Sequence, residues 1–155
     1  MPGTRKEGQT GVYRNTIFNH GTELLSIYSN PNYPKTAYEC FEHGLKVKPN
    51  AKCLGKRPWS STLGDYEPRY TWETYAEIAE RRTNVGAGLM HLAENDLALS
   101  PVTGWTVGIW ALNRPEWQVV SLATTAYSLV LVSLYETLGP SAVEYCTTHS
   151  ECRVS

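Results

Sequence analysis

The sequence predicts an α/β fold, because residues 105–139 have the pattern of a strand, a helix and a second strand. Two short apolar runs rich in β-forming residues, Thr106–Ala111 and Leu129–Leu134, are typical of strands buried on both faces. A helix-start sequence, Asn113-Arg114-Pro115-Glu116, lies between them. The unit has the roughly 30 residues that a right-handed crossover between parallel strands needs. We therefore expect an incomplete parallel sheet with flanking helices.

The helix of this unit is expected to begin after Asn113, a residue type favoured as an N-cap. Pro115 fits the first turn because its missing N–H would have no helical partner there, and Glu116 would meet the positive end of the helix dipole. Residues at helical spacing then give one mostly apolar face, formed by Trp117, Val120, Thr124 and Tyr127.

Two capping boxes upstream predict two further helices. Thr36 with Glu39 begins the first, which Gly44 and Pro49 should bracket at its end, with an inward face of Ala37, Cys40, Phe41 and Leu45. Thr74 with Glu77 begins the second, which should run to about Ala93. Its expected buried face is Tyr75, Ile78, Ala79, Arg82, Gly86, Leu89 and Ala93.

Short strands are expected at Ala51–Gly55 and Arg69–Trp72, joined by a long loop into a small antiparallel ribbon. Lys56 and Arg57 at the start of that loop are interpreted as ordinary solvated charge. Asn95–Gly104 is expected to be a loop. Gly139-Pro140-Ser141 should open a last helix that turns Val143 and Cys146 inward, and Arg153-Val154-Ser155 resembles the start of a third strand.

Composition indicates one globular domain preceded by a polar segment. Residues 1–35 are rich in Gly, Asn, Pro and Tyr and are expected to form an extended polar arm, with a short amphipathic stretch at Glu23–Tyr28. The 155 residues are 41% hydrophobic and carry a net charge of −1, which gives no electrostatic case for nucleic acid or an anionic membrane. No apolar run approaches the ~20 residues of a transmembrane segment.

Four cysteines lack CxxC spacing, which favours unpaired thiols in a reduced compartment over a disulfide framework. Cys146-x-x-His149-x-x-Cys152 offers three zinc ligands. A fourth is not evident in the sequence, so a structural role is favoured over a metal site.

Other candidate motifs have a functional and a structural interpretation. Gly86-Ala87-Gly88 could be a nucleotide-binding loop, but no strand precedes it, so close helix packing is favoured. Tyr135, Glu136 and Thr137 follow the carboxyl end of a predicted parallel strand, where α/β proteins place ligands; a turn that leads into a helix is the alternative. We expect His20, His43 and His91 to face solvent. Packing is favoured over a stacking platform for Trp59, Trp105 and Trp110, since no basic groove accompanies them.

Several of these segments resemble the AMP-forming acyl-CoA synthetases, in particular the eukaryotic long-chain fatty-acid–CoA ligases. The similarity covers roughly residues 36–155, and residues 133–145 resemble the fungal peroxisomal type. Ser133 departs from the pattern, since most relatives have Pro or Ala there. The segments that carry the resemblance, besides the helix at Thr36 and the strand at Ala51–Gly55, are Tyr70–Ile78, Val107–Ile109 with Asn113–Trp117, and Leu134–Gly139.

The resemblance implies an α/β fold that forms the opening βαβ part of the large N-terminal domain of an adenylate-forming enzyme. It also implies a long-chain fatty-acid–CoA ligase that uses ATP, Mg²⁺ and coenzyme A on a fatty acid. The family's phosphate-binding loop, ribose-binding acid and lysine lie downstream of Leu134–Gly139. The chain has no Gly-x-x-x-x-Gly-Lys-Ser/Thr motif.

No catalytic, cofactor-binding or metal residue is therefore carried over, and none of the cofactors is expected to bind this chain alone. We expect residues 36–155 to be a truncated AMP-binding domain that associates with the missing C-terminal portion or a full-length relative. A different functional class is the alternative, namely a non-catalytic interaction module or a relic. The implied location is the peroxisome, the cytoplasm or the surface of the endoplasmic reticulum.

Overall fold

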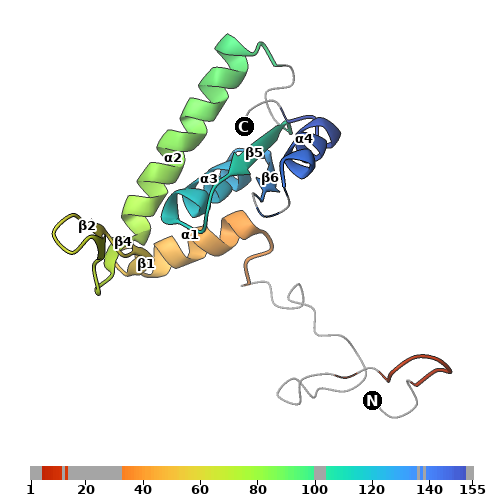
Figure 1. The fold of residues 1–155 in the computed structure, drawn as a ribbon, viewed down its shortest axis with the longest axis horizontal. Helices are drawn as coiled ribbons and strands as arrows, with labels where there is room; N and C mark the ends of the chain where they lie inside the picture. The colour runs from red at the N-terminus through yellow and green to blue at the C-terminus, as the bar shows by residue number, and fades with distance from the viewer. Residues whose placement is uncertain are drawn as a thin grey trace. The chain divides into compact units, whose positions relative to one another are not determined.

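The computed structural model describes residues 5–11, 13, 33–99, 104–135, 137 and 139–152 (Figure 1). The chain divides into two units, Met1–Lys35 and Thr36–Ser155. In the first, the Gln9 amide donates to the Lys6 carbonyl over 3.1 Å in a turn. The expected amphipathic stretch Glu23–Tyr28 and the expected third strand at 153–155 lie outside the described residues.

The central βαβ unit of the second body is confirmed. Strands β5 (Thr106–Trp110) and β6 (Val130–Leu134) pair in parallel with Thr106 opposite Val130, and helix α3 (Pro115–Ala126) connects them. Burial on both faces is confirmed only in part. Val107 and Leu134 are buried, whereas Val130 and Trp110 are exposed, because the part of the sheet that the structure describes has only these two strands.

Helix α3 begins one residue later than expected. Arg114, not Asn113, is the N-cap residue, and its side chain makes no capping hydrogen bond because a guanidinium has no acceptor for a helix N–H. Its Nε donates to Glu116. Pro115 occupies the first turn as predicted. The predicted apolar face is shifted: Val119, Ala123 and Thr124 are buried, whereas Trp117, Val120 and Tyr127 are only half-buried. The shift arises because α3 packs against other helices and strand β1 as well as against its own sheet.

Both predicted capping boxes are present. They begin α1 (Ala37–Val47) and α2 (Tyr75–His91), and α2 continues as the π-helical turn η3 (Leu92–Asp96). Every residue of the predicted inward face of α2 is buried or half-buried. The α1 face is narrower than predicted, since Phe41 and Leu45 point inward while Ala37 and Cys40 are exposed.

The antiparallel ribbon consists of β1 (Lys52–Lys56) and β4 (Thr71–Thr74), as expected to within two residues. The loop between them contains an additional hairpin, β2 (Trp59–Ser60) with β3 (Asp65–Tyr66), which was not predicted. Figure 1 shows this hairpin projecting beyond the N-terminal end of α2.

Two hydrophobic clusters hold the second unit together. One joins Ala93, Trp105, Val107 and Leu129, and the other joins Phe41, Ile78 and Val119. The last helix, α4 (Pro140–His149), lies beside β6, with Val143 and Cys146 half-buried (Figure 1). Gly139 precedes it at φ 83°, a conformation that suits glycine. This packing leaves the first turn of α3 facing the ribbon.

Candidate functional site

A cleft of about 650 Å³ lies between the ribbon and the first turns of α3. Its volume falls within the range of small-molecule sites, ~300–1,000 Å³. The residues that line it are Leu54, Gly55, Lys56, Arg57, Tyr66, Tyr70, Leu112, Asn113, Arg114, Pro115, Glu116, Trp117 and Gln118.

The ribbon wall of the cleft is held in place by Arg57. Its Nε donates to the Glu67 carbonyl over 2.6 Å, and one terminal nitrogen donates to the Tyr66 carbonyl over 2.8 Å. The Glu67 amide in turn donates to the Pro58 carbonyl over 2.8 Å. Arg57 therefore ties the β2–β3 hairpin to the end of β1, and its guanidinium is committed to backbone acceptors.

The α3 wall is organised around Glu116. Arg114 Nε donates to one carboxylate oxygen over 2.8 Å, while Lys56 and Arg81 each lie 3.8 Å from the other oxygen. Arg81 also donates to both carboxylate oxygens of Glu73 on β4, over 2.7 and 2.6 Å. The network therefore joins both strands of the ribbon to α2 and α3.

Electrostatics keep Glu116 ionised. The hydrogen bond from Arg114 is the main cause that lowers its pKa, followed by a backbone hydrogen bond, and the charges of Arg114 and Lys56 act in the same direction. The same hydrogen bond raises the pKa of Arg114. A carboxylate stabilised in this way is a fixed negative charge rather than a proton donor at neutral pH.

The lining of the cleft combines charged and apolar side chains. Three cations (Lys56, Arg57 and Arg114) and one carboxylate share it with aromatic and aliphatic side chains. Lys56 and Arg57 are exposed, as expected of solvated charge, but both take part in defined contacts.

The cysteine and histidine candidates do not converge. Within the described ranges, no three His, Cys, Asp or Glu side chains are placed to hold a metal ion. The His149 ring stacks on Tyr145 with centroids 5.2 Å apart, and Cys152 Sγ lies 3.2 Å from Ser150 Oγ. All four cysteines are free thiols in the structure, and burial is the main cause that raises the pKa of Cys53, with Glu73 second.

Gly86 is a packing residue, as favoured from the sequence. A β-carbon built there would lie 2.1 Å from Cε2 of Tyr127, so the ring occupies the space that a side chain would need. A β-carbon on Gly88 would meet nothing within 4 Å. The glycine pair therefore marks one close contact inside α2 and not a loop.

The remaining candidates lie away from the cleft or outside the described residues. Tyr135 and Thr137 are exposed after the end of β6, while Glu136 and His20 lie outside the described part of the chain. His43 and His91 are exposed, as expected. Trp105 is a core residue as predicted, but the prediction was wrong for Trp59 and Trp110, which are both 61% exposed.

Sequence reasoning missed the cleft, although two signals for it were present. A Lys-Arg pair ends the first ribbon strand, and an Arg-Pro-Glu sequence starts α3. Neither signal shows that these segments face each other, because they are far apart in the sequence. Most of the ribbon, α2 and β5 lie between β1 and the start of α3 along the chain.

Comparison with known proteins places these features in a family. The family described as AMP-binding enzyme matches residues 41–155. The peroxisomal acyl-CoA ligase 891 of Penicillium brevicompactum is 40% identical over 151 residues, which cover 97% of this chain and 20% of the relative. The human long-chain-fatty-acid–CoA ligase 6 is 38% identical over 138 residues, which cover 88% of this chain and 18% of the relative.

A plant relative gives the same result. The peroxisomal long chain acyl-CoA synthetase 7 of Arabidopsis thaliana is 37% identical over 153 residues, which cover 97% of this chain and 20% of the relative. The chain thus spans about 20% of the length of the curated relatives it matches. The resemblance inferred from the sequence segments is confirmed. Among the described residues, no helix has both the length and the apolarity to cross a membrane.

Proposed function

Because the chain belongs to the AMP-binding enzyme family, we propose that it is part of an ATP-dependent long-chain fatty-acid–CoA ligase. In that reaction the fatty-acid carboxylate attacks the α-phosphorus of ATP, which gives an acyl adenylate and releases pyrophosphate. The thiol of coenzyme A then attacks the acyl carbon and AMP leaves. The observation that supports the proposal is the 33–40% identity that the chain shares with long-chain and peroxisomal ligases.

Within such an enzyme, we propose that residues 36–155 supply a scaffold and not the reacting groups. The phosphate-binding loop, lysine and lid that the chemistry needs have no counterpart in the sequence segments that match the family. The isolated chain is therefore expected to bind none of ATP, Mg²⁺ and coenzyme A, and to show no fatty-acid-dependent exchange of pyrophosphate into ATP.

A chimera tests the proposal. Residues of this chain replace the matching 151-residue region of the Penicillium brevicompactum ligase, and formation of long-chain acyl-CoA is measured on the purified protein. The chimera is expected to be active. A control chimera carries Gly88→Ala, which meets no neighbour in α2 and should behave identically. A folded, soluble chimera without activity, beside an active parent, would contradict the proposal.

A non-catalytic interaction module is the alternative function. If the chain is an interaction module, it should associate with a full-length relative without contributing to catalysis. Co-purification of tagged chain with the Penicillium enzyme, together with a measurement of the enzyme's rate, separates the two functions. Binding without a functional chimera would favour the module.

We also propose a peroxisomal location, since two of the relatives described above are named as peroxisomal. Fluorescence imaging of the protein tagged at its own locus, beside a peroxisomal marker, tests this. A diffuse signal that does not overlap the marker would contradict it.

A further inference from the structure

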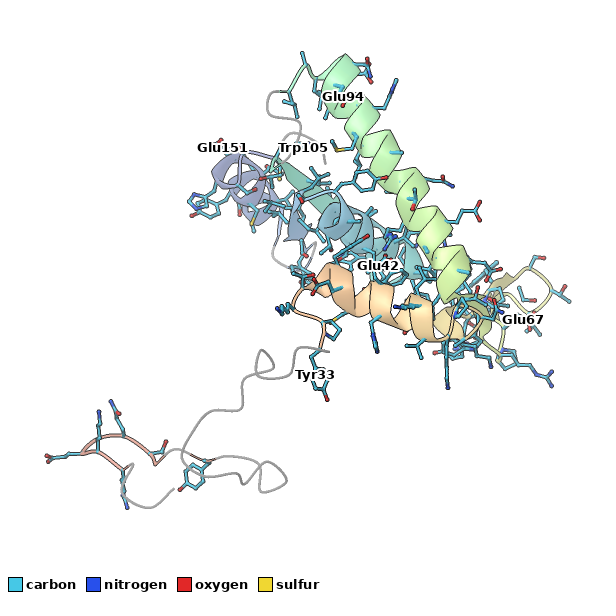
Figure 2. All side chains as sticks on the ribbon, turned by 180° about the vertical axis from the view of Figure 1, so that it is seen from behind. Tyr33, Glu42, Glu67, Glu94, Trp105 and Glu151 are labelled. Atoms are coloured by element: carbon cyan, nitrogen blue, oxygen red, sulfur yellow. The ribbon has the colours of Figure 1, made fainter. Side chains whose placement is uncertain are left out.

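Large hydrophobic side chains gather on the solvent side of the ribbon and its hairpin. Five of them are 46–61% exposed within a span of fourteen residues, and we call this set the aromatic surface: Trp59, Leu63, Tyr66, Tyr70 and Trp72. Soluble proteins seldom leave so many large apolar groups together without a binding partner. Figure 2 shows Glu67, in the middle of this span, at the opposite end of α2 from Glu94.

The aromatic surface is held in shape by its own contacts. Trp59 and Tyr66 meet edge to face with ring centroids 5.3 Å apart, and Tyr70 and Trp72 lie 5.9 Å apart. The Trp72 ring also covers Gly55, where a β-carbon would lie 2.9 Å from it. Rings ordered in this way lose little further freedom when they bind.

The two aromatic pairs belong to one continuous surface. Tyr66 from the first pair and Tyr70 from the second both line the cleft described above, together with Leu112, which is 73% exposed. One ring from each pair therefore borders the cleft.

The segment that carries these rings is rich in cations. The segment Lys52–Trp72 contains Lys52, Lys56, Arg57 and Arg69 against Asp65 and Glu67, a net charge of +2. Since the whole chain carries −1, the remaining residues carry −3. The net charge of the chain therefore hides a local excess of positive charge. Lys52 also lies over the Trp72 ring, 5.5 Å from its centroid.

Neighbouring carboxylates do not cancel this excess. Glu73 on β4 is held by Arg81, and Glu116 on α3 is held by Arg114. Glu116 also lies 3.8 Å from Lys56 inside the segment, but adding these two acids together with Arg81 and Arg114 leaves the net charge of the region at +2.

We propose that the aromatic surface is a contact site for a phospholipid bilayer that contains anionic lipid. Trp and Tyr have an apolar body and a polar tip, which favours the boundary between headgroups and acyl chains. Lysine and arginine at the edge of such a site attract an anionic leaflet, and their aliphatic stems cover apolar area. Protein–protein interfaces are instead depleted in lysine. The inference is independent of the proposed catalytic function.

Flotation of the full chain with vesicles tests the proposal. Vesicles of phosphatidylcholine alone and of phosphatidylcholine with 30% phosphatidylserine are mixed with the protein and raised through a density gradient, which leaves aggregates at the bottom. The native chain is expected to float with the mixed vesicles. Trp59→Ala should lower the partition coefficient about tenfold, since about 1.4 kcal/mol of ring burial is lost.

Trp110→Ala is the matched control, because Trp110 at the end of β5 has the same exposed fraction as Trp59. It should change partitioning less than twofold. Arg69→Gln tests the charge contribution, with about a fivefold loss on mixed vesicles and no change on phosphatidylcholine alone. Tyr70→Ser serves as a second aromatic variant if circular dichroism shows that Trp59→Ala does not fold.

Three results would overturn the proposal. The native chain could fail to float with either kind of vesicle, or the two tryptophan variants could lose binding equally. The third result is a chain that is dimeric without lipid and becomes monomeric with Trp59→Ala, which would make the aromatic surface an interface between two copies.

Discussion

Replacing Gly86 by alanine should destabilise the second unit, although the same change normally stabilises a helix. Inside a helix, alanine is more favourable than glycine by ~0.5–1 kcal/mol, because an unfolded chain with alanine has less conformational entropy to lose on folding. At Gly86 the new methyl group would lie 2.1 and 2.3 Å from two atoms of the Tyr127 ring, more than an ångström inside the 3.4 Å limit of ordinary contact.

Tyr127 has little room to move away. It follows the last turn of α3, its hydroxyl donates to the Thr83 carbonyl over 3.3 Å, and its ring packs against the cluster that contains Trp105 and Leu129. Overpacking of this kind costs ~1–3 kcal/mol. Subtracting the helical gain from the middle of this range leaves an expected net loss of about 1 kcal/mol in the free energy of unfolding.

Urea unfolding followed by circular dichroism measures this loss. Gly88→Ala is the matched control two residues along the same helix, and it should be more stable than the native chain by ~0.5–1 kcal/mol, since nothing lies within 4 Å. A double variant with Tyr127→Ala should recover most of the packing cost, because the clash is with that ring. If both alanine variants are stabilised alike, the packing assigned to Gly86 is wrong.

Three further effects follow from the structure. Thr74→Ala should lower the free energy of unfolding by ~1 kcal/mol because it removes the capping box of α2, whereas Thr74→Ser should cost much less; equal losses in denaturant titrations would refute the capping role. The pKa of Glu116 is lower in the folded state than its value near 4.5 in the unfolded chain. The contribution of its charge to the free energy of unfolding is therefore complete above pH 4.5 and is lost as the pH falls through the lower folded-state pKa. Glu116→Gln should therefore be less stable than the native chain at pH 7, and the difference between their melting temperatures should disappear below pH 4.5. A difference that stays constant with pH would show that ionisation of Glu116 does not contribute to stability. Arg82→Ala should cost roughly 1.5–3 kcal/mol, because it removes a charge-assisted hydrogen bond to the half-buried Glu42. The exposed Arg69→Ala should cost ~0.5 kcal/mol or less, and similar midpoints for both would exclude the pair described below.

Local signals predicted most of the secondary structure, because their causes lie within a few residues. Each capping box needs only a threonine and a glutamate three positions apart, and both form as expected. Asn113 failed as a cap for an equally local reason, since Pro115 fixes the first turn one residue later and Arg114 is drawn to Glu116. The hairpin at Trp59 and Tyr66 was missed because strands of two residues have no detectable alternation.

The cleft and the aromatic surface could not be predicted, because they depend on how distant segments pack. Trp59 was expected to be a packing residue, because the sequence shows no basic groove beside it that would make it a stacking platform. Its strand pairs only with β3, and the described part of the chain places no helix over that hairpin. A sequence pattern reports which faces are apolar, but not which of them find a neighbour.

Arg82 shows the same limit within the core. Its spacing placed it on the buried face of α2, where a cation needs a partner, and the structure supplies Glu42 from α1 at 2.5 Å. The guanidinium also lies over the rings of Phe41 and Tyr38, while its Nε is buried without a hydrogen-bond partner. Figure 2 shows Glu42 where α1 and α2 approach each other.

This pair gives α1 and α2 a defined register. Phe41 alone could slide along the apolar face of α2, because hydrophobic contact has no direction. A charge-assisted hydrogen bond between side chains 40 residues apart in sequence has one correct geometry, and any shift leaves a buried charge unpaired. The periodicity of α2 therefore predicts that Arg82 is buried. Its burial is tolerated only because α1 packs there and supplies Glu42 as the partner of its charge.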